Sequence, residues 1–221
     1  MGTLNNIEKA EQKRQNSIAF INATQQLITS EGLDHISIRK IAEKAGFHNS
    51  TLYLYFTDLN QLVMLASMKY FNEYSHSLEI QSQKKLSPIE NFLSIWSLFL
   101  NTVFKEPHIF NNFFYGKYSD NLKEIMTTYY ELFPEERYHF SKEIEEMYFG
   151  KNIIERSLNI LKPLIGITDS LTEENVTTAN ELIVSYCKYK LDLKCADPSL
   201  DSTQLKKDIM QAISFILTKS V

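Results

Sequence analysis

Residues 38–56 read IRKIAEKAGFHNSTLYLYF, and this stretch decides the fold of the amino-terminal region. Its first half has apolar residues at helical spacing and follows Ser37, a residue type that caps the start of a helix. Gly46 comes directly after the last of these apolar residues, where a glycine favours a tight left-handed turn. A short third helix is then expected at about 49–56, so the stretch predicts two helices joined by a turn.

The flanking sequence extends this unit in both directions. A first helix is expected over 16–30, with Phe20 and Leu27 on its inner face, and Gly32 is placed to end it. Asp58 is placed to cap a fourth helix over 59–76, where apolar residues recur every three or four positions. The first three helices therefore predict a helix-turn-helix unit.

The outer face of the short third helix carries side chains that suit DNA. The major groove is wide enough to admit a helix, and each base pair presents a distinct donor and acceptor pattern there. Short polar side chains and tyrosines can bond to base edges or to phosphates. The candidates are His48, Asn49, Ser50, Thr51, Tyr53 and Tyr55.

The remaining sequence predicts an all-α protein, because long stretches lack Gly and Pro and their apolar periodicity is helical. We expect a helix-turn-helix domain over 1–57 and a larger helical domain over 58–221. Further helices are expected over 89–105, 107–115, 119–132, 136–149, 152–167, 172–194 and 202–219.

Composition restricts the function less than the motif does. The formal net charge is −4, and residues 1–60 hold equal numbers of acidic and basic side chains, which predicts modest non-specific affinity for DNA. Cys187 and Cys195 lie eight residues apart on one predicted helix, so we expect two thiols, without a disulfide or metal site. The first residues have no apolar signal core and no run could span a bilayer, so the protein is expected to be cytoplasmic. No cofactor is expected.

The stretch from residue 38 to residue 62 resembles the signature of the tetracycline-repressor (TetR) family of bacterial transcriptional regulators. The resemblance covers roughly residues 14–65, and the rest is similar only in being helical and of typical length. The matching elements are Ile41-Ala42, Ala45-Gly46, Thr51-Leu52-Tyr53, Tyr55-Phe56 and Leu62, with Gly32 at the expected distance upstream.

This resemblance implies roles for individual residues at the DNA. Ser37 and Lys40 match positions that bind phosphates, and Arg39 matches one that reaches a guanine edge or the backbone. Asn49 is expected to pair with adenine and Thr51 to contact a thymine methyl group or a phosphate. Tyr53 and Tyr55 are expected to touch the backbone, whereas Ala45, Leu52 and Phe56 are expected in the core.

Two positions depart from the family pattern. The family usually has a phosphate-binding Lys where this chain has Leu59, and commonly a capping Ser where it has His48. No Lys or Arg occurs between Phe47 and Met68. We therefore expect DNA binding with a shallow salt dependence, although Leu59 is equally compatible with an ordinary apolar start of a helix.

The carboxy-terminal helices and the middle of the chain suggest a dimer and a ligand pocket. Helices 172–194 and 202–219 are expected to pair with those of a second copy, because 202–219 is apolar over more than one stripe. Sixteen of the 27 aromatic residues fall between Phe92 and Phe149, enough to wall a cavity for a small apolar or aromatic effector. Most of these rings should be core. The candidates for lining the cavity are Trp96, Phe99, Phe113, Tyr115, Tyr129 and Tyr130.

The sequence therefore predicts a ligand-responsive DNA-binding regulator that binds a palindromic operator as a homodimer. Repression is the usual outcome in the family, and an effector would release the DNA by shifting the fourth helix. An enzyme is disfavoured because no nucleotide-binding, nucleophile-elbow or zinc-protease motif occurs and the five His are scattered. The alternative is a helical small-molecule carrier or interaction protein that does not bind DNA.

Overall fold

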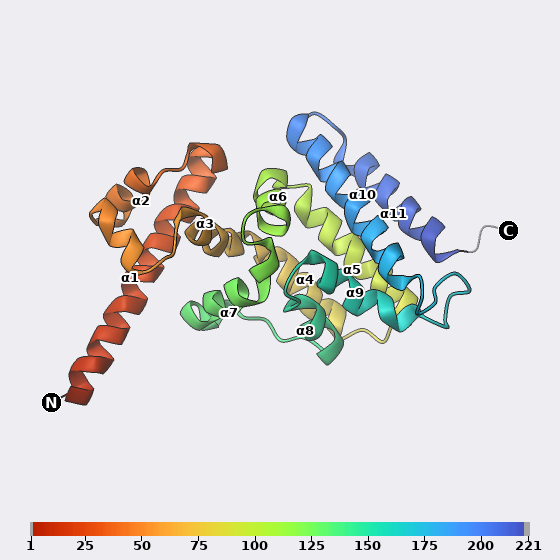
Figure 1. Ribbon diagram of the computed structural model, residues 1–221, viewed down its shortest axis with the longest axis horizontal. Helices are drawn as coiled ribbons and strands as arrows, with labels where there is room; N and C mark the ends of the chain where they lie inside the picture. The colour runs from red at the N-terminus through yellow and green to blue at the C-terminus, as the bar shows by residue number, and fades with distance from the viewer. Residues whose placement is uncertain (1, 219–221) are drawn as a thin grey trace. The chain divides into compact units, whose positions relative to one another are not determined.

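The computed structural model describes residues 2–218, with no side-chain description for residues 2–5, and its regular elements are helices (Figure 1). Among these residues the only β-type pairing is an isolated bridge between Ile165 and Thr168, so the all-α prediction is confirmed. The elements are α1 (Gly2–Glu31), η1 (Leu33–His35), α2 (Ile38–Ala45), η2 (Asn49–Leu54), α3 (Leu59–Ser67), η3 (Met68–Phe71), α4 (Asn72–Ser82), α5 (Pro88–Val103), α6 (Pro107–Tyr115), η4 (Ser119–Asn121), α7 (Leu122–Leu132), η5 (Pro134–Glu136), α8 (Lys142–Tyr148), α9 (Ile153–Leu161), η6 (Lys162–Leu164), α10 (Val176–Ala196) and α11 (Ser202–Leu217).

The chain divides into two compact units. The first unit contains residues 1–70 together with 124–137, and the second contains 71–123 together with 138–221. The domains predicted from the sequence, 1–57 and 58–221, were defined by expected function. Their boundary differs from the boundaries of the two packing units.

The first unit is built on α1, which packs against α2 and α3. Phe20, Ile21 and Leu27 of α1 are buried, as the predicted inner face requires. Ser37 caps α2 by accepting a hydrogen bond from the Lys40 amide at 3.4 Å. Asp58 caps α3 in the same way by accepting from the Gln61 amide at 2.9 Å. These residues therefore set the helix starts that the sequence predicted.

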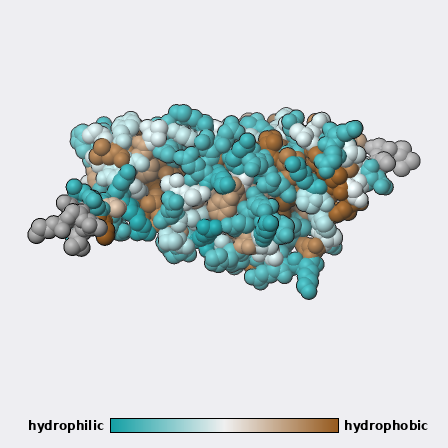
Figure 2. Space-filling model, turned by 60° about the horizontal axis from the view of Figure 1, so that its bottom comes forward, coloured by the Kyte–Doolittle hydropathy of each residue, from teal (hydrophilic) through white to brown (hydrophobic). Residues whose placement is uncertain are grey.

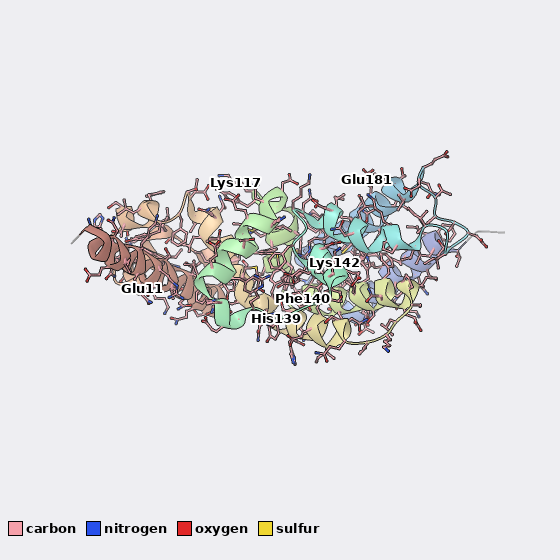
Figure 3. All side chains as sticks on the ribbon, turned by 90° about the horizontal axis from the view of Figure 1, so that it is seen from below. Glu11, Lys117, His139, Phe140, Lys142 and Glu181 are labelled. Carbon is pink, nitrogen blue, oxygen red and sulfur yellow. The ribbon has the colours of Figure 1, made fainter. Side chains whose placement is uncertain are left out.

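The first helix is longer than predicted, because it begins at Gly2 and not near residue 16. Polar side chains one turn apart stabilise the added turns: Gln12 donates to Asn16 at 2.9 Å and Gln15 donates to Glu11 at 2.7 Å (Figure 3 labels Glu11). Arg14 also donates to the Leu132 carbonyl at 2.7 Å, which fastens α1 to the 124–137 segment within the same unit.

Two other helices of this region differ from the prediction. The third helix is a 3-10 helix, η2, and it ends at Leu54. Its Asn, Ser and Thr side chains compete for backbone hydrogen bonds, which disfavours a regular α-helix. The predicted fourth helix, 59–76, is interrupted by η3, and the boundary between the two units falls in that break, between Tyr70 and Phe71.

The second unit is a bundle in which α9 packs against α8 and α10, while α10 also packs against α6 and α11. α5 packs against α4 and α11. Its core is largely aromatic. Phe71 lies 4.5 Å from Phe113 and 5.1 Å from Phe110 between ring centroids, and Phe99 lies 5.1 Å from Phe114. Among the described residues, no helix is long and apolar enough to cross a membrane.

Four helix predictions in the second half of the chain need correction. The helix expected over 119–132 begins as η4, and only 122–132 is α-helical. The helix expected over 152–167 ends at Leu161, before Pro163 within η6. The helix expected from Thr172 begins at Val176, because Thr172 and Asn175 instead bond to each other in a turn.

The largest error concerns residues 136–149, where only α8 is helical. The preceding segment, which includes His139 and Phe140 (Figure 3), is held by contacts outside itself. The Tyr138 hydroxyl donates to Asn72 at 2.9 Å, the His139 amide donates to Glu79 at 3.0 Å, and the Phe140 ring lies 4.7 Å from Tyr148. Tertiary contacts with α4 and α8 therefore override the helical periodicity of the sequence.

Among the described residues, neither Cys187 nor Cys195 forms a disulfide. Cys187 is buried on α10, and burial raises the pKa of its thiol to about 12. The thiol is therefore protonated at neutral pH, which disfavours reactivity.

Candidate nucleic-acid interface

An aromatic cluster fixes η2 against α1. The Phe20 ring stacks on Phe47 with centroids 4.8 Å apart, and it lies 5.8 Å from Tyr55 and 6.0 Å from Phe56. Leu52 is fully buried beside them. This cluster fills one side of the short helix, so the other side is directed to solvent.

The turn before η2 is a hydrogen-bonded helix end. Gly46 has φ of 79° in the left-handed region, its amide donates to the Glu43 carbonyl at 3.2 Å, and the Phe47 amide donates to the Ala42 carbonyl at 2.8 Å. These two bonds are the pair that defines a Schellman motif. The motif reverses the chain after α2 and delivers Phe47 to the Phe20 ring, as the sequence predicted.

His48 caps η2 in place of the Ser that the family commonly has. The Ser50 amide donates to His48 Nδ1 at 3.4 Å, and the Ser50 hydroxyl lies 2.9 Å from the same nitrogen. An accepting Nδ1 assigns the proton of the neutral ring to Nε2, which is then a hydrogen-bond donor on an exposed side chain.

Most of the predicted reading residues lie on the exposed side of η2. His48, Asn49, Ser50 and Tyr53 are exposed, and Thr51 is half-buried. Leu54 is 71% exposed, whereas Leu52, two residues earlier, is 0% exposed. Sequence reasoning did not single out Leu54, an apolar residue between Tyr53 and Tyr55. The three-residue period of a 3-10 helix places residues 52 and 55 inward and leaves 53 and 54 outside.

Tyr55 lies differently from the other candidates. It is half-buried, contacts the Phe20 ring, and its hydroxyl accepts a hydrogen bond from Asn16 at 2.7 Å. Its ring and hydroxyl therefore attach η2 to α1, which is a positioning role within the protein.

The basic residues at the start of α2 also differ from each other. Arg39 is exposed, and among residues 2–218 no ion-pair partner is found for it. Lys40 donates to Glu31 at 2.6 Å and to the His35 carbonyl at 2.9 Å. Lys40 would have to leave these partners to reach a phosphate, whereas Arg39 would not.

Leu59, where the family usually has Lys, is half-buried at the first position of α3. The Thr57 amide beside it donates to Gln61 at 2.7 Å. The backbone amide before α3 is therefore already bonded within the protein. The start of α3 contributes no positive side chain to the surface formed by η2 and the start of α2.

The candidate ligand residues do not form one group. Trp96 and Phe99 line a cavity of about 20 Å³ among α4, α5, α8 and α9 of the second unit. Phe113 is core, against Phe71. Tyr115 lines an open groove beside α9 and α10. Tyr129 and Tyr130 belong to the first unit and do not line the cavity.

The Tyr129 side chain is bonded within the first unit and does not face the cavity. Its hydroxyl donates to Glu136, and the same carboxylate pairs with Lys69, whose ammonium lies 4.1 Å from the centroid of the Phe133 ring. Burial and the neighbouring Glu136 carboxylate raise the pKa of Tyr129. This group holds the 124–137 segment to η3 within the first unit.

The different positions of Tyr53 and Tyr55 generate a prediction. Tyr55→Phe removes the acceptor of the Asn16 amide and should lower the free energy of unfolding by about 1 kcal/mol, the usual net value of one hydrogen bond. Tyr53→Phe removes a hydroxyl from an exposed side chain and should leave stability unchanged. Urea denaturation of both variants measures the difference, and equal midpoints would refute the positioning role of Tyr55.

Comparison with known proteins shows what this region is similar to. Residues 20–64 match the family model described as bacterial regulatory proteins, tetR family. The chain is 26% identical over 106 residues to an uncharacterized HTH-type transcriptional regulator of Haemophilus influenzae. That match covers 48% of this chain and 57% of the relative, so it spans little more than half of that protein.

Solved structures resemble the whole fold. Thermus thermophilus FadR, a TetR-family transcriptional repressor in complex with lauroyl-CoA, superposes with a TM-score of 0.60 at 12% identity, covering 93% of this chain and 96% of that one. RolR in complex with resorcinol superposes with a TM-score of 0.57 at 16% identity, covering 95% and 98%. Together with the turn at Gly46 and the exposed face of η2, the family-model match shows that residues 20–64 form a helix-turn-helix region of the kind found in TetR-family regulators.

Proposed function

We propose that the protein is a homodimeric repressor that binds a palindromic DNA operator in the cytoplasm and releases it when a small apolar or aromatic effector binds. The observation that carries this proposal is the exposed face of η2, where polar side chains point to solvent opposite a sealed aromatic cluster. A face of this kind has no role in the core of its own unit, and it has the size and chemistry that the major groove accepts.

Each side chain on this face, and each polar residue at the start of α2, suits a particular contact. Asn49 can bond to both major-groove positions of adenine, and Arg39 can bond to guanine or to a phosphate. Ser37, Ser50 and Tyr53 supply hydroxyls for the backbone. Leu54, Thr51 and the Nε2 donor of His48 add contacts to thymine methyl groups and to acceptors. Lys40 contributes to phosphate binding only if it exchanges Glu31 for the DNA.

Dimerisation is supported by exposed apolar side chains on each of the last two helices. On α10 one face packs into the bundle, and the opposite face still carries Leu182, 58% exposed, and Tyr189, 53% exposed. On α11, Phe215 is 68% exposed. Apolar surface is visible near the carboxy-terminal end of the chain in Figure 2. Two such helices from each copy can pair as a four-helix bundle, which would bury these side chains.

A palindromic site follows from the dimer. Two copies related by a twofold axis place their reading helices in successive major grooves about 34–36 Å apart. Release of DNA on effector binding then requires two states of the dimer that differ in the separation of the reading helices. An effector that weakens DNA binding a hundredfold must supply about 2.7 kcal/mol of coupling, through its different affinity for the two states.

Effector binding is supported by the aromatic second unit and its cavity between α5 and α9. Two solved structures of similar fold were determined in complex with lauroyl-CoA and with resorcinol. The chain passes from the first unit to the second through η3, so a change in the second unit can reach α3 along the backbone.

The proposal is tested by selecting bound duplexes from random DNA with the full-length protein. The expected product is an inverted repeat whose half-sites are centred about 10 base pairs or a multiple of that apart. Recovery of no sequence preference would contradict the proposal and favour the alternative, a helical carrier or interaction protein.

Leu59 generates a second prediction, about salt dependence. Leu59→Lys adds a cation at the start of α3 and should steepen the log-log dependence of affinity on salt by about 0.9 per subunit, because each neutralised phosphate releases counterions. Ile80→Lys on α4, an apolar residue that is 48% exposed, is the matched control and should leave the slope unchanged. An unchanged slope for Leu59→Lys would show that residue 59 does not face the DNA.

The dimer generates a third prediction. Leu182→Glu places a charge on the outer stripe of α10 and should raise the dimer dissociation constant at least tenfold, because a desolvated charge has no partner there. Ile80→Glu makes the same kind of change at an exposed apolar position outside α10 and α11, and should leave association unaffected. Sedimentation equilibrium measures both. A wild-type protein that is monomeric at every concentration would exclude the dimer.

A further inference from the structure

The small cavity of the second unit contains polar groups that its own fold leaves without partners. Its volume is about 20 Å³, and its walls are mostly aromatic rings and isoleucines of α4, α5 and α9. Trp96 and Ser157 are each only 3% exposed and both line the cavity. Among the described residues, neither the Trp96 indole Nε1 nor the Ser157 hydroxyl has a hydrogen-bond partner.

Such groups are costly in a protein core. A buried donor left without an acceptor loses its hydrogen bonds to water and gains none in the protein, so buried polar atoms are normally paired. Trp96 and Ser157 come from different helices, α5 and α9, and they meet at one cavity. The space is large enough for one water molecule or for one polar group of a ligand.

Arg156 adds a positive charge to the same cavity wall. The side chain is 2% exposed, donates to the Tyr148 carbonyl, and has its guanidinium carbon 5.2 Å from the centre of the Tyr148 ring and 5.6 Å from that of Phe114. Burial raises the pKa of the Tyr74 hydroxyl, and the nearby Arg156 charge partly opposes that rise. The charge of Arg156 therefore acts at the cavity wall to which Tyr74 also belongs.

The backbone is shaped to admit this arginine. A Cβ atom at Gly150 would lie 2.8 Å from Arg156 Cγ and 3.0 Å from the Arg156 amide nitrogen. A side chain at residue 150 would displace the helix and the stem of Arg156. Glycine there, the Tyr148 carbonyl and the two rings together hold the guanidinium in one place.

We infer that this cavity is the head-group subsite for an apolar carboxylic acid, bound as its carboxylate by Arg156, the Trp96 indole N–H and the Ser157 hydroxyl. The inference rests on the proposed function and specifies the class of its effector. A carboxylate is favoured because it has only acceptors, matches donors from two helices, and is attracted by a cation of low solvent exposure. The isoleucine and aromatic walls favour an apolar body.

The body of the acid needs more room than the cavity provides. Met147 lines the cavity, and its flexible thioether side chain can change rotamer at little cost. Binding would therefore expand the packing between α5, α8 and α9. A close-packed interior has to rearrange to admit the ligand. The ligand would therefore favour a different conformation of this unit.

A purely structural role for Arg156 makes different predictions. Tyr148 is the last residue of α8, so Arg156 also satisfies a carbonyl at a helix end. Replacement of Arg156 would then lower stability without changing ligand selectivity. The decisive variants are therefore Ser157→Ala and Trp96→Phe, which remove unpartnered donors. Ser157→Ala should not lower the stability of the ligand-free protein, whereas Trp96→Phe also removes buried ring volume and is judged by ligand selectivity.

The experiment compares matched acids and alcohols by isothermal titration calorimetry with the full-length protein. Octanoate and phenylacetate are the acids, and 1-octanol and 2-phenylethanol are their neutral counterparts. At least one acid should bind the wild type at least tenfold more tightly than its alcohol. Ser157→Ala and Trp96→Phe should each reduce that preference about fivefold or more, and Arg156→Met should abolish it.

Ser75→Ala is the matched control. Ser75 is buried, its hydroxyl lies 2.6 Å from that of Tyr148, and it does not line the cavity. This variant should lose stability and keep the preference for the acid. Equal binding of acids and alcohols, binding of neither acid, or a preference that survives Ser157→Ala and Trp96→Phe would overturn the inference.

A separate readout distinguishes this inference from the proposed function. The selected DNA duplex is titrated with protein in the presence of the acid. Binding of the acid without release of DNA would support the carboxylate site and contradict its use as an effector site. Sequence-specific DNA binding together with equal affinity for acids and alcohols would leave the regulator intact and remove the carboxylate site.

Discussion

The contact between Phe20 and the rings of Phe47, Tyr55 and Phe56 is the interaction on which the reading unit depends. It joins α1 to residues on both sides of η2, so it fixes the rotation of that short helix about its own axis. Removing a buried phenylalanine ring from such a cluster costs about 3–5 kcal/mol. A 3-10 helix of six residues has little stability of its own, and the direction of its outer side chains is therefore a property of this cluster.

Local rules were sufficient to predict the frame of this unit. Ser37, Gly46 and Asp58 each act through bonds within a few residues of themselves, and each lies where its chemistry indicated. The exposed position of Asn49 and the buried position of Leu52 also agree with the sequence. What the sequence did not reveal depends on distant partners. Tyr55 bonds to Asn16, 39 residues away, and Lys40 bonds to Glu31.

The same distinction applies to the second unit. The periodicity over 136–149 is helical, yet contacts with Asn72 and Glu79 hold its first part out of a helix. Nothing in the sequence distinguishes Arg156 from other charged residues on helices, which are ordinarily solvated. Only the packed structure brings it to the cavity with Trp96 and Ser157. The exposed apolar residues of α10 and α11 were partly predictable from the sequence. A helix whose apolar residues cover more surface than one packing contact requires can be recognised from its periodicity.

The central claim is that side chains of η2, held outward by the Phe20 cluster, read bases in the major groove. The most direct measurement is the affinity of Asn49→Ala for the selected duplex and for a random duplex at the same salt concentration. Our account predicts a loss of about 1–3 kcal/mol per altered base contact on the selected duplex and no change on the random one. An equal loss on both duplexes, or no loss on either, would contradict it.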